Sequence, residues 1–392
     1  MFVAIAFWFL LGIMFYTYFG YIIILMICSL IKKISSNSRA FDQQPYFPEV
    51  TLIIAAYNEK LIIDEKVRNA LQQNYPQDKI HQIWITDGST DGSEQFLKKY
   101  EFITILHQPQ REGKTAALNR AMAFVKTPIT IFTDANTMLD RQAILELVNP
   151  FKDSNVGCVS GEKRILMSKI ENATASGEGI YWKYESFIKK LESNCGSTLS
   201  AAGELFAIRT ELYTQISSNT ILDDFVISTN IAKKGFVIKY SPKAFATERA
   251  SASINEERKR KVRIAAGGFQ SLFHQHEMLN PIKFPLLSFQ FISHKVLRWV
   301  FLPLALLFLP ILNIILVIIC SGNYLYVVAL IAQIIFYALV LTGFLFRNKQ
   351  MWAKWLFLPY YLFITNISII QGFGRYLSGK QNVKWEKSLR QT

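Results

Sequence analysis

Acidic side chains follow three short apolar segments of the chain, at the point where each segment ends. The segments are Val50–Ala56, Gln82–Thr86 and Ile129–Thr133, and the acids that follow them are Glu59, Asp87 and Asp134. Each segment has the length and composition of a buried β-strand. Acids at the carboxyl ends of parallel strands mark the ligand crevice of an open α/β sheet. The pattern predicts an enzyme with a nucleotide-binding α/β domain.

Asp87 begins a turn that is rich in Gly, Ser, Thr and Asp. A carboxylate in this position can accept a hydrogen bond from the N–H of a uracil base or from a ribose hydroxyl. The alternative is a structural role, because Asp and Ser in such turns commonly cap the helix that follows. Asp91 suits the capping role, so Asp87 is a candidate nucleotide-binding residue.

Asp134 and Asn136 are separated by one residue. Two oxygen-bearing side chains at this spacing can face the same metal ion. Mg²⁺ and Mn²⁺ prefer oxygen ligands and bridge the phosphates of nucleotides. We therefore predict a site for Mg²⁺ or Mn²⁺ at Asp134, with the neutral Asn136 as a weaker second ligand than an acid would be.

Two adjacent acids, Asp223 and Asp224, begin a predicted helix. If both lie near a metal ion and a phosphate, repulsion between them would raise the pKa of each carboxyl and favour a general base. The alternative is that the pair only caps the helix.

Lys114 follows Gly113 in a segment that resembles part of a P-loop. A P-loop requires a second glycine five residues before Gly113, where this chain has Gln108, so we reject this interpretation. At the start of a predicted helix, Lys114 can still contact a phosphate.

A run of basic residues lies on one predicted helix between Glu257 and Arg263. Such a run usually forms a solvated face. However, Arg260 and Arg263 are three residues apart and share one side of the helix, where two guanidinium groups can clamp a diphosphate.

Strands and helices alternate along the region that must position these residues. Predicted strands cover Val50–Ala56, Ile80–Thr86, Ile103–His107 and Ile129–Thr133, and predicted helices cover Lys60–Gln73, Ser93–Tyr100, Lys114–Val125 and Arg141–Phe151. This rhythm predicts a parallel sheet covered by helices. Further strands are predicted at Val156–Ser160, Glu204–Arg209 and Phe236–Tyr240, and further helices at Asp224–Lys234 and Ser253–Gln275.

Residues 161–200 form a mixed stretch that contains one amphipathic helix, Ile180–Leu191. We expect its apolar face to contain Ile180, Tyr184, Phe187 and Leu191. This helix and Phe284–Phe291 either pack on the domain or lie in the membrane interface.

Three uncharged apolar segments are long enough to span a bilayer. They are Phe2–Ile31, Val300–Cys320 and Tyr324–Phe346. A fourth segment, Trp355–Phe373, is less apolar, and we expect it to lie in the membrane interface or to re-enter rather than cross.

The net charge of +14 is explained by Lys and Arg residues beside these segments. Such cations orient membrane proteins with the positive side inward, which predicts a plasma-membrane protein whose N-terminus is outside and whose central domain is cytoplasmic. A nucleic-acid partner is not expected, because the basic residues are not interleaved with aromatics on one face. The four cysteines are scattered and predict neither a metal site nor a disulfide framework.

The sequence therefore divides into four parts. We expect an N-terminal transmembrane helix at 1–34, a cytoplasmic α/β domain at 45–280, interfacial and transmembrane helices at 281–375, and a basic tail at 376–392.

The order and spacing of these motifs resemble the family 2 glycosyltransferases with a GT-A fold, over roughly residues 48–270. The resemblance is greatest to the membrane-integrated hyaluronan, cellulose, chitin and poly-N-acetylglucosamine synthases. It implies a Rossmann-like, nucleotide-sugar-binding GT-A domain inserted between transmembrane helices.

The resemblance implies roles for single residues. Nucleotide-sugar binding would involve Ala56, Tyr57, Glu59, Asp87, Lys114, Asp134, Arg260 and Arg263. Asp134 matches the first acid of the metal motif, and Asp224 matches the last acid of the Thr-Glu-Asp motif, the inferred base. The segment 260–264 aligns with a Gln-x-x-Arg-Trp motif but has Arg260 and Ile264 at its two ends, which weakens the inference of a processive enzyme.

The resemblance also implies an acceptor side. Gly203 and Glu204 would belong to the acceptor-side strand, and Trp385 and Arg390 match a tail motif that lies near the cytoplasmic active site in such synthases.

The implied function is inverting transfer of a sugar from a nucleotide sugar, with a UDP-sugar expected, to a growing polysaccharide or glycan. One alternative is a non-processive enzyme that adds one sugar to a lipid-linked acceptor. Another is a non-catalytic membrane subunit that binds a nucleotide sugar or gates export, against which the presence of Asp87, Asp134 and Asp224 argues. The expected partners are the donor, a glycan or lipid-linked acceptor, and the lipid bilayer.

Overall fold

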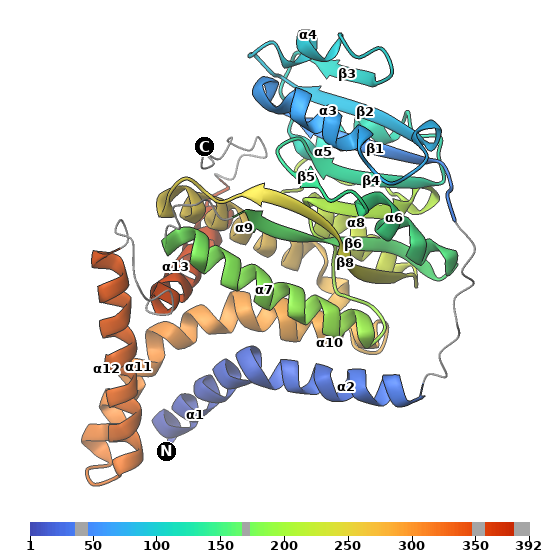
Figure 1. Ribbon diagram of the computed structural model, residues 1–392. Helices are drawn as coiled ribbons and strands as arrows, with labels where there is room; N and C mark the ends of the chain where they lie inside the picture. Colours follow the sequence, from blue (N-terminus) through green and yellow to red (C-terminus); the bar gives the residue numbers. More distant parts are fainter. Residues whose placement is uncertain (36–45, 167–172, 347–356, 380–392) are drawn as a thin grey trace.

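The computed structural model describes residues 1–35, 46–166, 173–346 and 357–379, and its centre is a mixed sheet of eight strands (Figure 1). The strand order is β3-β2-β1-β4-β7-β6-β8-β5. The strands are β1 (Val50–Ala56), β2 (Ile80–Asp87), β3 (Thr104–Gln108), β4 (Ile129–Asp134), β5 (Met138–Leu139), β6 (Val156–Leu166), β7 (Leu205–Arg209) and β8 (Val237–Arg249).

The strands β1 to β4 form one parallel part of the sheet, and β6 and β8 form a second parallel pair. Every residue of β1 is buried, as expected for an apolar strand that is covered on both faces. After β3 the chain returns to the other side of β1 to form β4, so the order of strands reverses between β1 and β4. Open α/β sheets bind ligands beyond such a reversal, at the carboxyl ends of the strands. The predicted parallel arrangement is thus confirmed for β1 to β4, whereas β7 runs antiparallel to β4 and β6.

Helices cover both faces of the sheet, because alternate residues of each strand point to opposite sides. Leu52 and Ile54 pack on the side of α3 (Ile63–Leu71), α4 (Ser93–Leu97) and α6 (Ala143–Val148). Ile53 and Ala55 pack on the side of α5 (Lys114–Met122) and α8 (Asp223–Lys233). Short 3₁₀ turns are η2 (Lys60–Ile62), η3 (Gln77–Lys79), η4 (Asn149–Lys152), η5 (Thr210–Leu212) and η6 (His276–Leu279).

Two long helices, α7 (Ala173–Asn194) and α9 (Ile254–His274), lie between the sheet and the apolar helices (Figure 1). The mixed stretch predicted at 161–200 is mostly regular, since β6 extends to Leu166 and α7 has 22 residues. The predicted apolar face of this helix is wrong in part. Ile180 and Phe187 are 38% and 44% exposed, whereas Glu185 and Lys189 are buried.

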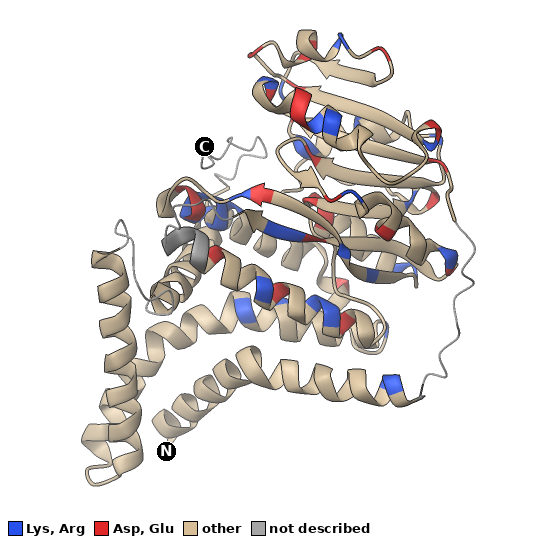
Figure 2. Ribbon diagram, viewed as in Figure 1, with Lys and Arg blue, Asp and Glu red and all other residues tan. Residues whose placement is uncertain are grey.

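The apolar segments form a separate set of helices. They are α1 (Phe2–Phe15), α2 (Tyr21–Ser35), α10 (Pro285–Gln290), α11 (Leu302–Ile319), α12 (Tyr324–Leu345) and α13 (Leu358–Leu377), with π-helical segments η1 (Tyr16–Gly20) and η7 (Phe291–Phe301). Three continuous spans are long and apolar enough to cross a membrane: Phe2–Ile34, Pro285–Ile319 and Tyr324–Leu345. Figure 2 shows that charged residues gather on the sheet and its neighbouring helices, while α1, α11 and α12 carry none.

Within the described ranges, α13 is not among these candidate spans. It packs along α9, where the helices approach closely at a glycine: a Cβ on Gly372 would lie 2.5 Å from the Cβ of Ala265. The contact ties α13 to the sheet domain.

Candidate active site

A cavity of about 520 Å³ opens at the carboxyl ends of β1 and β4. Acidic side chains from three separate parts of the chain line it: Asp134 ends β4, Glu204 precedes β7, and Asp223 and Asp224 begin α8. The fold thus brings together residues that are far apart in sequence.

Lys114, the first residue of α5, lies among these acids. Its Nζ atom is 2.7 Å from Asp134 Oδ1 and 3.7 Å from Asp223 Oδ2. Burial disfavours the ammonium, but the carboxylates of Asp134 and Asp223 outweigh this effect and raise the pKa of Lys114. Lys114 therefore supplies a cation to the crevice at all physiological pH values.

Asp224 has the properties of a general base. Burial, followed by the charge of Asp223, raises the pKa of the Asp224 carboxyl to about 7. A group with this pKa can take and release a proton near neutral pH. The alternative capping role is not seen in the described residues, because Leu222 is the N-cap of α8 and no side chain caps the helix.

Gly203 lies directly against Asp224. A Cβ built on Gly203 would be 3.1 Å from Asp224 Oδ2, a distance tighter than most real contacts. Position 203 thus leaves room for the carboxylate of the candidate base.

The acid cluster offers a suitable set of donors for Mg²⁺ or Mn²⁺. Asp134 and Asp223 provide carboxylate oxygens, and Asp223 Oδ2 is buried with no hydrogen bond from any described residue. Asn136 also lines the cavity, but its amide nitrogen donates to Glu248 at 3.2 Å. The described residues contain no group of three or more His, Cys, Asp or Glu side chains that could hold a metal ion. A metal ion would therefore depend on additional oxygens, such as those of a diphosphate.

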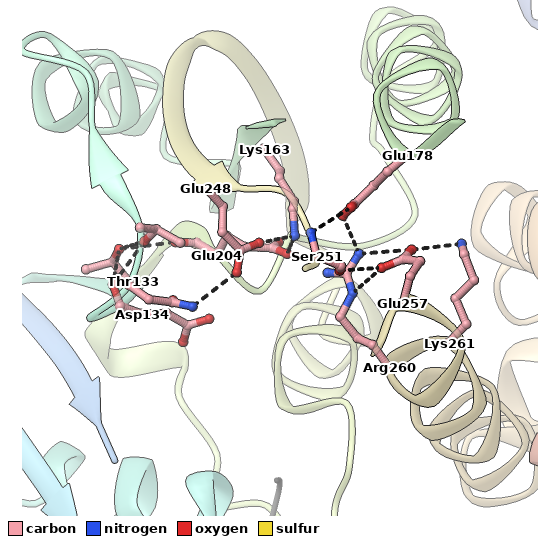
Figure 3. A network of polar contacts seen from close by, with 12 residues as sticks. Thr133, Asp134, Lys163, Glu178, Glu204, Glu248, Ser251, Glu257, Arg260 and Lys261 are labelled. Atoms are coloured by element: carbon pink, nitrogen blue, oxygen red, sulfur yellow. Dashed lines mark hydrogen bonds and ion pairs between the residues drawn. The ribbon is translucent and has the colours of Figure 1, made fainter. Parts of the chain in front are cut away.

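Glu204 is paired rather than free. Figure 3 shows Lys163 between Glu204 and Glu248, and its Nζ atom lies 2.6 Å from Glu204 Oε1. Burial opposes ionisation of Glu204, but the ammonium of Lys163 lowers the pKa of Glu204 to about 2. Glu204 therefore stays ionised and is unsuited to act as a base near neutral pH.

The two arginines of the predicted clamp have different surroundings. Arg260 is engaged with acids of α7 and α9: it lies 2.7 Å from Glu178 and 3.1 Å from Glu257 (Figure 3). Arg263 also lines the cavity, but it makes no hydrogen bond or ion pair with any described residue. Arg263 is thus the arginine available to a ligand, while Arg260 joins two helices.

Asp87 stabilises the loop before α5. It is 1% exposed and accepts hydrogen bonds from the backbone N–H groups of Glu112 and Gly113, at 3.1 and 2.7 Å. These contacts hold the segment that leads into Lys114. Asp87 thus contacts the loop before α5 and not the helix that directly follows it in the chain, which was the capping role considered above. A contact between Asp87 and a nucleotide stays a prediction.

The other predicted nucleotide residues lie at the end of β1. Tyr57 and Glu59 line the cavity, whereas Ala56 is 1% exposed. The guanidinium of Arg111 stacks 3.8 Å from the centre of the Tyr57 ring. Trp385 and Arg390 lie outside the described residues.

The cavity also contains side chains that the sequence reasoning missed. They include Lys189 and Trp182 of α7, Lys295, Arg298 and Trp299 of η7, and Tyr361 of α13. The signal in the sequence was the repeated charge on the side of α7 opposite the predicted apolar face. This charge pattern can be interpreted only from the structure, in which Lys295 and Arg298 of η7 pair with Glu185 of α7.

Comparison with known proteins gives a consistent result. Residues 48–267 match the family described as "Glycosyltransferase like family 2". The poly-β-1,6-N-acetyl-D-glucosamine synthase of Staphylococcus aureus (strain COL) is 26% identical over 269 residues, which cover 65% of this chain and 63% of that protein. The synthase of Staphylococcus epidermidis is 24% identical over 272 residues, covering 66% of this chain and 64% of that protein. The chain thus spans less than two thirds of the length of these relatives.

A solved structure shares the architecture. The mannosyltransferase of Pyrobaculum calidifontis, in complex with GDP-Man and Mn²⁺, superposes with a TM-score of 0.68 over 95% of this chain and 98% of that chain, at 22% identity. This similarity shows a common GT-A fold. Because the family match extends from β1 into α9 and covers more than half of the chain, the protein belongs to the glycosyltransferase-like family 2.

Proposed function

We propose that the protein is a membrane-bound, inverting glycosyltransferase that moves a sugar from a nucleotide sugar to a growing polysaccharide or other glycan. The observation that carries the proposal is the position of Asp224, against Gly203 and in one cavity with Lys114 and Asp134. Sugar transfer by single displacement needs a base for the acceptor hydroxyl and positive charge for the leaving diphosphate. The cavity offers both.

In the proposed reaction, the acceptor hydroxyl attacks the anomeric carbon from the face opposite the nucleoside diphosphate. Asp224 takes the hydroxyl proton, a contribution of about 10²–10⁴-fold. The bond from the anomeric carbon to the phosphate oxygen breaks, and the diphosphate leaves with the electron pair. Lys114 and Arg263 stabilise the charge that develops on it. When bound at Asp134, Mg²⁺ or Mn²⁺ would neutralise further charge on the diphosphate.

The donor is proposed to be a UDP-sugar. The relatives named above are synthases of an N-acetyl-D-glucosamine polymer, and the Pyrobaculum calidifontis enzyme was solved with GDP-Man. The second of these names includes a nucleotide sugar, and the first indicates transfer of a sugar to a polymer. Tyr57, Glu59 and Asp87 are the proposed contacts to the nucleoside of the donor.

The proposed location is the plasma membrane, with the domain at 45–280 on the cytoplasmic side. Three apolar helical spans support membrane insertion. Lys32 and Lys33 at the end of α2 favour an inward orientation of the chain that follows.

A donor screen tests the proposal. Full-length protein in lipid nanodiscs is incubated with UDP- and GDP-sugars, and release of the nucleoside diphosphate is measured with Mg²⁺, with Mn²⁺ and with excess chelator. We expect metal-dependent release from one or a few sugars. Asp224→Asn should lower the rate at least about 10²-fold while donor binding is retained. Glu211→Gln, at an exposed acid outside the cavity, is the matched control.

Two results would contradict the proposal. Binding of donors without release of diphosphate from any of them would favour a non-catalytic subunit. Wild-type turnover by Asp224→Asn would assign the base to another residue.

A further inference from the structure

The cavity continues from Asp224 away from the sheet and toward the apolar helices. Its lining on this side comes from α7, η7, α11 and α13. The segment η7–α11 belongs to the candidate membrane span Pro285–Ile319. The cavity therefore joins the candidate base to a part of the protein that is suited to lipid.

Lys189 is a buried cation without a partner on this side of the cavity. It is 8% exposed, and within the described ranges its ammonium has neither a hydrogen bond nor an ion pair. Burial, followed by repulsion from Lys295, lowers the pKa of Lys189. Among the nearby carboxylates, Asp224 contributes most to raising the pKa of Lys189, but its effect is smaller than that of burial. A buried charge is costly unless an anion or hydrogen-bond acceptor reaches it.

Arg298 has two nitrogen atoms that donate no hydrogen bond to a described residue. It is 8% exposed and pairs with Glu185 through Nη1, while Nε and Nη2 are buried with no acceptor among the described residues. Lys295 lies 3.6 Å from the same carboxylate of Glu185. The second acid nearby, Glu192, is held by His294 at 2.8 Å. Local positive charge therefore exceeds what these acids neutralise.

Aliphatic side chains also line the same cavity. They include Leu302 of α11 and Leu358, Leu362 and Ile369 of α13. A ligand that fills the cavity from Asp224 toward α11 and α13 thus meets both cations and aliphatic side chains. A neutral glycan matches neither feature, because it has no anion for Lys189 and no hydrocarbon for the leucines.

We propose that Lys189, Lys295 and Arg298, here called the inner cation site, bind the phosphate of a lipid-linked acceptor. The lipid chain would extend along Leu302 and Leu362, and the acceptor sugar would present its hydroxyl to Asp224. This inference rests on the proposed glycosyltransferase function and names the class of its acceptor: a glycan carried on a lipid phosphate or diphosphate.

Binding of small probes to the full-length protein tests the inner cation site without requiring turnover. The probes are geranyl phosphate and geraniol, which share a hydrocarbon chain and differ in the phosphate. Trp182 and Trp299 line the cavity, so quenching of tryptophan fluorescence reports occupancy. We expect wild-type protein to bind geranyl phosphate at least about tenfold more tightly than geraniol, a difference of about 1.4 kcal/mol.

The variant Lys189→Met should lose this preference, whereas Lys189→Arg should retain most of it. Lys190→Met is the matched control, because Lys190 is the next residue of α7 and is exposed. Binding of the nucleotide sugar should persist in all three variants. The comparison of the two probes on wild-type protein does not depend on the folding of any variant.

The outcomes separate this inference from the proposed function. Donor turnover with equal affinity for geranyl phosphate and geraniol would overturn the inner cation site alone. Absence of donor binding and turnover would overturn the proposed function instead. If inorganic phosphate or UDP displaces geranyl phosphate and Lys189→Met weakens UDP binding equally, Lys189 serves the donor and the inference is wrong.

Discussion

The α-carbon of Gly203 packs so closely on Asp224 that an added Cβ would lie 3.2 Å from the carboxyl carbon. Gly203→Ala should therefore push the carboxylate out of position without changing its chemistry. We expect turnover to fall by about tenfold, since misplacement of a catalytic group by a fraction of an ångström is costly. The measurement is kcat at saturating donor concentration. The affinity for the donor should be unchanged.

The control for this variant is Gly374→Ala in α13, where an added Cβ would meet no atom within 4 Å. Equal activity of Gly203→Ala and wild-type protein would show that the close contact with Asp224 has no role in turnover.

The raised pKa of Asp224 predicts a pH-dependent effect on stability in metal-free protein. Its carboxyl has a pKa of about 7 in the folded protein, above the ordinary value of 3.8, so folding favours the protonated form. The corresponding stability is present at low pH and is lost as the pH rises through 7. Asp224→Asn cannot ionise and should avoid this loss.

We therefore expect the thermal midpoint of Asp224→Asn to exceed that of wild-type protein at pH 8, with the gap closing toward pH 5. Both proteins are measured in chelator and in the same detergent. A gap that is constant with pH would mean that Asp224 does not titrate in this range.

The different surroundings of Arg260 and Arg263 predict two distinct phenotypes. Arg260→Ala leaves the buried carboxylates of Glu178 and Glu257 without their arginine, and breaking such a pair typically costs about 3–5 kcal/mol. Arg263→Lys keeps the charge but loses the planar guanidinium that suits a phosphate. It should lower kcat/KM for the donor by about tenfold at unchanged thermal stability.

Thermal unfolding and donor kinetics of both variants provide the check. If Arg260→Ala and Arg263→Lys lose donor affinity equally and keep normal thermal stability, both arginines bind the donor, as the sequence predicts.

The parallel half of the sheet could be predicted from the sequence because its signals are local. Val50–Ala56 is an uninterrupted apolar run and forms β1 with the predicted ends. Asp134 is a predicted metal ligand because it directly follows such a run. The surroundings of Lys114 and Asp224 depend on residues that are distant in sequence, yet their positions at predicted helix starts already make them candidate site residues.

The face of α7 could not be predicted in this way. Glu185 and Lys189 looked solvent-facing because hydropathy assigns charged residues to the surface. Glu185 is buried because Arg298 and Lys295 of η7 neutralise it, more than a hundred residues later in the chain. Only the packing of α7 against η7 reveals that this face lines the cavity. The same reasoning applies to Arg260, whose partner Glu178 lies on α7.

Lys163 is the shared counter-ion of Glu204 and Glu248, and its loss should destabilise the protein strongly. Its side chain is fully buried between Glu204 and Glu248. Lys163→Met would leave both carboxylates without their counter-ion, at a cost of about 3–5 kcal/mol near neutral pH. Lys243→Met on the neighbouring strand β8 is the control, because Lys243 is exposed.

The cost of Lys163→Met should depend on pH in a defined direction. Lys163 holds the pKa of Glu204 at about 2, below the ordinary 4.5, so its stabilising effect is full above pH 4.5 and is lost as the pH falls toward 2. The difference in thermal midpoint between wild-type protein and Lys163→Met should therefore shrink below about pH 4.5. Adding Glu204→Gln and Glu248→Gln to Lys163→Met should recover part of the stability at pH 7, because the two buried charges are then removed. A loss that is independent of pH and unaffected by these changes would assign Lys163 a packing role in place of an electrostatic one.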